Sequence, residues 1–130
     1  AAMQHINFIR DLKEDCELQR QYLPVSDLQK FQLKNFCSLN IGDETERKKI
    51  IALIRFEIKL YQAKQKFAER GYAYIPYLSL VPIKTAADLY RWTARRIAKQ
   101  PLKVFEQKIK PSKLIVFLTL LKNVFLCLRY

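Results

Sequence analysis

Glycine, proline, cysteine and histidine are scarce in this 130-residue sequence, which has 2 Gly, 5 Pro, 3 Cys and 1 His. So few turn-forming residues argue against a sandwich or barrel of many short strands. The three cysteines are widely separated and form no Cys-x-x-Cys motif, which disfavours a disulfide framework and a zinc site. A single histidine, His5, disfavours a Ser-His triad or a Cys-His dyad within the chain. We therefore expect reduced cysteines and an intracellular protein.

The charge distribution divides the chain into two parts. Residues 1–46 carry 8 acidic and 5 basic side chains, residues 47–130 carry 4 acidic and 19 basic ones, and the whole chain has a net charge of +12. A basic second part favours an anionic partner, which could be nucleic acid, a membrane surface or the phosphates of a small ligand. The basic run over residues 91–113 has no clear interleaving of aromatics and no known base-reading motif. We therefore expect no nucleic-acid partner.

No stretch of the sequence is typical of a signal peptide or of a membrane span. The first ten residues lack a basic region followed by an apolar one. The most apolar stretch, residues 114–128, is short for a span and contains Lys122 and Asn123, so we expect a buried or interfacial helix there. Together with the basic charge, these features predict a cytoplasmic protein that makes peripheral contact with a membrane.

The hydrophobic periodicity is helical almost throughout, and the length fits one domain covering residues 1–130. We expect helices over residues 1–20, 26–31, 43–70, 85–100 and 111–130, a connector over 32–42 and a proline-bounded aromatic segment over 72–82. The boundary signals are Asp43-x-x-Glu46 and Thr85-x-x-Asp88 as N-terminal caps, Gly71 and Pro101 as ends, and Pro111 as a first-turn residue. The sequence therefore predicts an all-α protein.

Polar side chains cover one face of the first predicted helix. At about 100° per residue, five of them fall within an arc of roughly 100°: Gln4, Asn7, Asp11, Glu14 and Asp15. Carboxylates four residues apart repel each other unless something neutralises them. Mg²⁺ does so, and it is usually held by one or two carboxylates together with substrate phosphates. A solvated polar face is the alternative that the spacing alone leaves open.

Two blocks of sequence resemble one enzyme family. The first is Ala2-Met3-Gln4-x-x-Asn7-x-x-Arg10-Asp11-x-x-Glu14-Asp15, followed by Arg20-x-Tyr22-Leu23-Pro24. The second comprises Ala86-x-x-Leu89-Tyr90, Ile97, Val104-Phe105 and the stretch Lys108-Ile109-Lys110-Pro111-Ser112-Lys113. The first block resembles the second aspartate-rich motif of the squalene/phytoene synthase family, and the second block looks like that family's C-terminal helices. The resemblance covers nearly all of this chain but only about the C-terminal half of a family member.

The resemblance implies an all-α isoprenoid-synthase fold and an enzyme that joins two prenyl diphosphates head to head with Mg²⁺, or alternatively Mn²⁺. It implies that Asn7, Asp11 and Asp15 ligate metal, with Glu14 beside them. It also implies that Arg10 and Arg20 face diphosphate oxygens, that Gln4 lines the pocket and that Lys113 contacts phosphate. Asp11, Asp15 and Arg10 would be the catalytic residues. Metal and arginine forks offset the charge of the leaving diphosphate, and a dry apolar cavity protects the carbocation.

The chain departs from the family pattern in one missing motif and at two positions. The family has an earlier Asp-x-x-x-Asp on a facing helix, and no such motif partners the first block within these 130 residues. We therefore expect this chain to hold half of an active site, to need the N-terminal half of the same fold and to be inactive alone. Leu102 stands where a diphosphate-binding Tyr is frequent, and Gln19 stands where many members have Gly.

The sequence leaves three functional hypotheses open. The fuller strings look most like microbial phytoene synthases, which join two C20 geranylgeranyl diphosphates. A squalene or dehydrosqualene synthase acting on C15 farnesyl diphosphate is the first alternative. A non-catalytic assembly or binding relative of the same fold is the second, and it would be expected to have lost acidic ligands that are present here. The intact acidic face therefore favours the enzyme.

Overall fold

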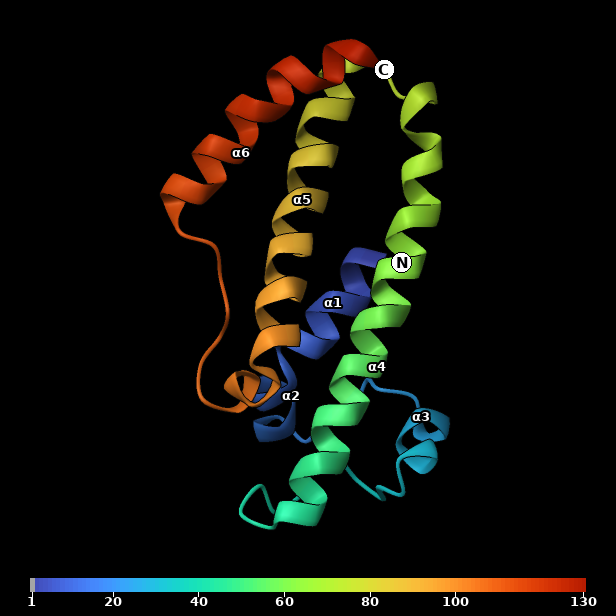
Figure 1. Ribbon diagram of the computed structural model, residues 1–130, viewed down its shortest axis with the longest axis vertical. Coiled ribbons are helices and arrows are strands. Elements are labelled where there is room, and N and C mark those ends of the chain that lie inside the picture. The colour runs from blue at the N-terminus through green and yellow to red at the C-terminus, as the bar shows by residue number, and fades with distance from the viewer. Residues whose placement is uncertain (1) are drawn as a thin grey trace.

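A computed structural model describes residues 2–130 as six α-helices and three 3₁₀-helices, with no strand in that range (Figure 1). The predicted all-α class is confirmed. In chain order the elements are α1 (Ala2–Arg10), α2 (Leu12–Glu17), α3 (Val25–Lys30), α4 (Glu44–Ala68), η1 (Glu69–Tyr74), α5 (Tyr77–Lys99), η2 (Pro101–Phe105), α6 (Lys113–Leu126) and η3 (Cys127–Arg129).

The two long helices, α4 and α5, run in opposite directions, and α1 packs against both of them (Figure 1). The main core lies where these three helices meet. Its fully buried side chains include Ile6 and Ile9 of α1, Leu53 and Ile58 of α4, and Ile97 of α5. Removing such apolar surface from water is the main force that holds α1 in place. Because α1 carries the predicted polar face, this core fixes where that face lies.

The start of α4 is the predicted one, and its end is not. The Asp43 carboxylate accepts a hydrogen bond from the Glu46 backbone N–H at 3.0 Å, as an N-cap does. The Glu46 side chain turns to the Asn40 backbone N–H at 2.7 Å, so the capping box is not reciprocal. Gly71 does not close the helix, because the chain continues from α4 into η1 and neither glycine adopts a positive φ. That predicted C-terminal boundary is wrong.

The predicted start of α5 at Thr85 is also wrong, since the helix begins eight residues earlier, at Tyr77. The Thr85 hydroxyl donates to the Val81 carbonyl at 2.7 Å inside the helix and accepts from the Asn123 amide at 3.3 Å. Thr85 therefore serves the contact between α5 and α6 instead of capping a helix. Pro82 lies within α5. It is only the sixth residue of the helix, so the hydrogen bond that its missing N–H would make belongs to the first turns of the helix.

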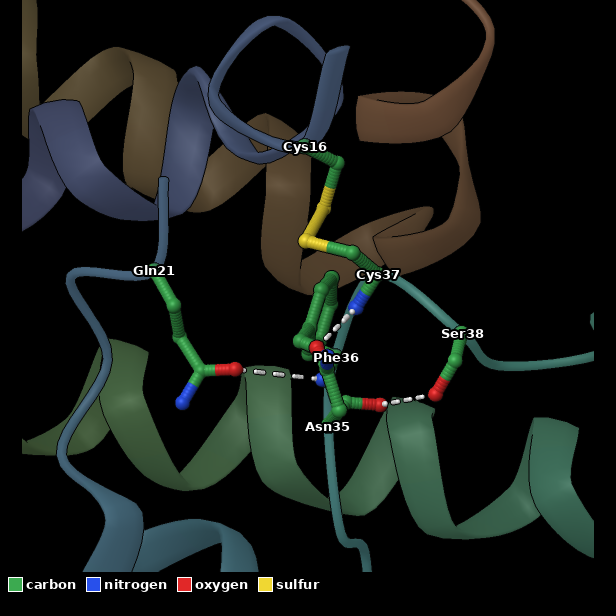
Figure 2. Close-up of a disulfide and its surroundings, with 6 residues drawn as sticks. All are labelled: Cys16, Gln21, Asn35, Phe36, Cys37 and Ser38. Atoms are coloured by element: carbon green, nitrogen blue, oxygen red, sulfur yellow. Dashed lines mark hydrogen bonds between the residues drawn. A yellow bond between two sulfur atoms is a disulfide. The ribbon is translucent and has the colours of Figure 1, made fainter. Parts of the chain in front are cut away.

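A disulfide joins Cys16, in α2, to Cys37, in the connector that leads to α4, with 5.2 Å between the two Cα atoms (Figure 2). The expectation of reduced cysteines is therefore wrong for this pair. The sequence did not show the pairing because 21 residues separate the partners and only the folded connector brings them together. Cys127 is free and buried.

The last α-helix, α6, lies along α5 and ends near η1 (Figure 1). It turns Thr119 and Asn123 inward and exposes much of its apolar surface, with Leu114 66% and Phe117 61% exposed. Of the two predicted alternatives, a buried helix is therefore wrong within residues 2–130, and an interfacial helix stays a prediction. Among those residues, no helix combines the length and the apolar character that crossing a bilayer requires.

Candidate functional site

The acidic face of the first predicted helix is bent at Asp11. The sequence predicts one helix over residues 1–20, but α1 stops at Arg10 and α2 begins at Leu12, with Asp11 between them at φ −97° and ψ 13°. Hydrogen bonds from Asp11 N to Asn7 O and from Asp15 N to Asp11 O, both 2.9 Å, still cross the bend. The Asp11 carboxylate does not cap α2. It is instead engaged by two cations, which explains the irregular boundary.

Those two cations are Arg10 and Lys108. The Arg10 guanidinium donates to both Asp11 carboxylate oxygens, Nε to Oδ1 at 2.8 Å and Nη2 to Oδ2 at 2.7 Å. The Lys108 ammonium lies 3.1 Å from Asp11 Oδ1 and 2.7 Å from Glu14 Oε2. A bidentate guanidinium fork is a strong, directional pair, whereas an ammonium is a mobile point charge. Lys108 thus offsets part of the negative charge that Asp11 and Glu14 bring together.

Opposing effects set the pKa values of the carboxyls. Burial acts to raise the pKa of Asp11, but hydrogen bonds from Arg10 and Lys108 outweigh it and hold that pKa below its usual range. Burial and the charges of Asp11 and Glu14 raise the pKa of Asp15. Asp15 therefore lacks the compensation that Asp11 has. Hydrogen bonds to Glu14 and Asp11 raise the pKa of Lys108, which stays charged.

Asn7 offers an oxygen that the rest of the chain leaves unused. Its Nδ2 donates to the Tyr90 hydroxyl at 3.4 Å, a weak hydrogen bond that connects α1 to α5. Its Oδ1 is buried and has no hydrogen-bond partner among the described residues. A buried polar atom without a partner is costly unless a ligand, ion or water completes it. Asn7 Oδ1 therefore fits the oxygen-donor role that the family resemblance implies.

The described residues fit Mg²⁺ only as part of a larger ligand set. No group of three His, Cys, Asp or Glu side chains within residues 2–130 is gathered closely enough to hold a metal ion by itself. An amide oxygen and one or two carboxylates are nonetheless the hard ligands that Mg²⁺ uses when substrate phosphates and water supply the others. Asn7 Oδ1 and the carboxylates of Asp11 and Asp15 supply that chemistry.

Two hollows meet at Arg10. The first, of about 350 Å³, is polar and lies between α1–α2 and η2–Lys108; it is lined by Arg10, Asp11, Lys13, Glu14, Glu17, Val104 and Lys108. The second, of about 270 Å³, is mainly apolar and is lined by Arg10, Ala86, Leu89, Tyr90, Thr93 and Pro111. A charged compartment that shares a wall with an apolar one suits a ligand with an anionic head and a hydrocarbon tail.

Three predicted site residues lie apart from this arrangement. Gln4 lines a different cavity of about 260 Å³, beside His5 and Phe8. Arg20 is exposed, but its backbone N–H donates to the Asp15 carbonyl at 2.7 Å and its charge acts to lower the pKa of Asp15. Lys113 is the exposed first residue of α6 and makes no ion pair within residues 2–130. Leu102, at the position where the family frequently has Tyr, packs half-buried against the main core.

Sequence reasoning missed Tyr90 and Lys108 as site residues. Their partners, Asn7 and Glu14, are 83 and 94 residues away in the chain, and no local spacing reveals such contacts. Both residues stand in the second family-like block, which is the signal that could have identified them.

Comparisons with known proteins identify the family of this chain. A family model described as "Squalene/phytoene synthase" matches residues 1–114. The chain is similar to the 15-cis-phytoene synthase of Synechocystis sp., with 32% identity over 118 residues that cover 88% of this chain and 34% of that protein. It is also similar to the phytoene synthase of Arthrospira platensis, with 35% identity over 107 residues that cover 82% of this chain and 34% of that protein.

A third relative is the 15-cis-phytoene synthase of Enterobacter agglomerans, which is 27% identical over 111 residues covering 85% of this chain and 37% of that protein. No solved structure matches the chain significantly. The chain spans about a third of the length of these curated relatives. The family model covers most of the chain, and the matched residues 1–114 include the bent acidic face, Tyr90 and Lys108. The chain therefore belongs to the squalene/phytoene synthase family.

Proposed function

We propose that this protein is a prenyl transferase that condenses two prenyl diphosphates head to head, and that residues 2–130 supply one of its two acidic clamps. The observation that carries the proposal is the meeting of the polar and apolar hollows at Arg10. A prenyl diphosphate has the matching division into an anionic head and an apolar tail. The head would lie toward Arg10 and Lys108, and the tail toward Leu89 and Tyr90.

Each group has a defined part in this proposal. Asn7, Asp11 and Asp15 would hold Mg²⁺ together with diphosphate oxygens, and Glu14 would stand beside them. When bound, the metal offsets the negative charge of the leaving diphosphate. Arg10 would donate its remaining N–H groups to the diphosphate, and Lys108 would move from the carboxylates to the same oxygens. Arg20 and Lys113 are proposed as outer cationic contacts. The apolar lining would keep water from a carbocation.

The second acidic clamp is proposed to lie outside this chain, in the part of the fold that its longer relatives also contain. The bent acidic face offers at most one cluster of carboxylates, whereas two diphosphates leave during the proposed reaction. Residues 1–130 by themselves are therefore proposed to be inactive. The retained acidic and amide side chains support an enzyme over a non-catalytic assembly or binding relative.

We propose geranylgeranyl diphosphate as the substrate, because each of the three curated relatives reported above is named a phytoene synthase. Squalene or dehydrosqualene synthesis from farnesyl diphosphate is the alternative. A pocket that accommodates the longer chain gains about 0.8 kcal/mol per additional buried CH₂ group. A pocket with a bulky floor excludes that chain by overpacking.

Competition between the two substrates tests this assignment. The full-length protein is incubated with equal concentrations of C15 and C20 diphosphates and Mg²⁺, and the hydrocarbons are separated by chain length. We expect a C40 product that disappears when EDTA removes the metal. A pool dominated by C30 hydrocarbon would transfer the assignment to squalene or dehydrosqualene synthesis. Formation of no hydrocarbon would contradict the proposed enzyme altogether.

We also propose that the protein works in the cytoplasm at a membrane surface, where apolar prenyl substrates partition. Residues 107–130 contain five basic side chains and no acidic one. In the same segment α6 exposes Leu114, Phe117 and Phe125. Apolar side chains next to basic ones suit the interface of an anionic leaflet. These features support peripheral contact.

A further inference from the structure

The turn that follows α2 has a strained backbone. Gln19 adopts φ 54°, which is in the left-handed region that favours glycine. Its N–H donates to the Cys16 carbonyl at 3.0 Å, and the N–H of Arg20 donates to the Asp15 carbonyl at 2.7 Å. The turn therefore sets the backbone of Arg20 against Asp15. A non-glycine residue keeps such a conformation only when its surroundings enforce it.

Two links to the connector enforce this turn, one on each side of Gln19 (Figure 2). On the N-terminal side, Cys16 is bonded to Cys37. On the C-terminal side, the Gln21 side-chain oxygen accepts a hydrogen bond from the Phe36 backbone N–H at 3.4 Å. The hydrogen bond is long and weak, so the disulfide is the stronger of the two links. The stack of Tyr22 on Phe8 and the burial of Leu23 hold the chain after the turn, so losing the disulfide would free the side of the turn that follows α2.

The connector is itself firmly anchored at Phe36. That side chain is 2% exposed, and its ring stacks on Phe105 of η2 with 5.3 Å between the ring centroids. Three residues after Phe105 comes Lys108, whose ammonium contacts Asp11 and Glu14. The disulfide thus ties the end of α2 to the same core position that supports the segment leading to Lys108.

A reductant can reach this disulfide. Cys37 is exposed and Cys16 is half-buried, so the disulfide lies at the surface. Cys16 belongs to α2, which also lines the polar hollow. Cys127 is different, because it is 3% exposed and burial raises the pKa of its thiol. A buried thiol with a raised pKa is a poor nucleophile and a poor exchange partner. Cys127 therefore provides a matched control within the same chain.

We propose that the Cys16–Cys37 pair is a redox switch that sets the affinity of the acidic face for Mg²⁺ and diphosphate. One thiolate of a dithiol reductant attacks a cysteine sulfur, which forms a mixed disulfide and releases the other cysteine. The second thiol of the reductant then attacks its own partner sulfur in that mixed disulfide and releases the remaining cysteine. Two electrons and two protons pass from the reductant to the protein, so Cys16 and Cys37 become thiols and the reductant becomes a disulfide. The Gln19 turn then relaxes, which separates Arg20 from Asp15. The choice of ligand rests on the proposed function, whereas the motion does not.

The test compares the oxidised and the dithiol-reduced forms of the full-length protein, with the state of Cys16 and Cys37 verified by alkylation and peptide mass analysis. Amide hydrogen exchange follows the Gln19 and Arg20 N–H groups, and calorimetry measures the binding of Mg²⁺ with inorganic diphosphate. On reduction we expect exchange at these two amides to become about tenfold faster. We expect the affinity for diphosphate to fall about five- to tenfold.

Variants separate the switch from general damage. The double variant Cys16→Ser/Cys37→Ser should behave like the reduced form and ignore the dithiol, whereas Cys127→Ser should keep the full redox response. Gln19→Gly removes the backbone strain, so this variant should keep its diphosphate affinity when reduced. Equal exchange rates in the oxidised and reduced forms would overturn the switch. If neither form binds Mg²⁺ and diphosphate, the proposed function is contradicted, and the exchange rates still decide whether the turn is released.

Discussion

Replacing Asp11 or Asp15 with asparagine in the full-length protein should lower the rate of diphosphate release by about a hundredfold or more. The substitution removes a carboxylate charge that holds the metal, so the metal stabilises the transition state less. Each substitution preserves the size of the side chain and removes only its charge. The Mg²⁺ concentration needed for half-maximal activity should rise in both variants. Single-turnover measurement of released diphosphate over a Mg²⁺ titration provides both quantities.

The two variants should differ in stability. Asp11 accepts two hydrogen bonds from Arg10 and contacts Lys108, so Asp11→Asn also disrupts local ion pairs. Asp15 forms no ion pair within residues 2–130, so Asp15→Asn should leave the melting temperature nearly unchanged. Glu44→Gln is a matched control, since Glu44 is an exposed carboxylate of α4 whose only ion pair within residues 2–130 is with Lys48. Near-normal turnover in both aspartate variants would refute the metal assignment.

Replacing Glu57 with leucine should destabilise the fold by about 3 kcal/mol. Glu57 is 1% exposed, and its Oε2 lies 2.7 Å from His5 Nε2. On the other side of the ring, His5 Nδ1 lies 3.1 Å from the Lys64 ammonium. An ammonium can only donate, so Nδ1 accepts and Nε2–H donates to Glu57. The substitution leaves that buried donor without an acceptor between α1 and α4.

A double-mutant cycle isolates this interaction. In His5→Leu/Glu57→Leu both polar groups are gone and the space between α1 and α4 is filled with apolar side chains, so most of the lost stability should return. Lys64 can then turn its ammonium toward water. Denaturant unfolding of the wild type, both single variants and the double variant measures the coupling. A Glu57→Leu variant as stable as the wild type would show that the pair contributes nothing to holding α1.

Local sequence signals predicted the elements whose boundaries depend on local chemistry. The Asp43 carboxylate caps α4 as expected, and Pro101 follows the end of α5. The polar positions at three- and four-residue spacing also lie on α1 and α2, except Asp11, which lies between the two helices. The predicted helix boundaries were wrong where the residue that indicated the boundary is bonded to a residue far away in the chain. Thr85 is hydrogen-bonded to Asn123 and caps nothing, and Pro82 is accommodated early in α5 instead of preceding it.

The missed parts of the site share one cause. The Lys108–Glu14 ion pair, the Asn7–Tyr90 hydrogen bond and the Cys16–Cys37 disulfide all join segments that only tertiary packing brings together. Periodicity reports on which face of its own helix a residue lies, not on the segment that this face meets. The departure at Gln19 is the instructive case. The φ of 54° explains why glycine suits this position, and the flanking links to the connector explain how glutamine is accommodated.

The most direct test of the central claim is a crystal structure of the full-length protein with Mn²⁺ and a non-hydrolysable prenyl thiodiphosphate, with the metal located by its anomalous scattering. The account predicts the metal in direct contact with oxygens of Asp11, Asp15 and the diphosphate. It also predicts that the Lys108 ammonium has left Asp11 for the diphosphate. A structure with the ligand bound elsewhere and Lys108 still between Asp11 and Glu14 would contradict the account.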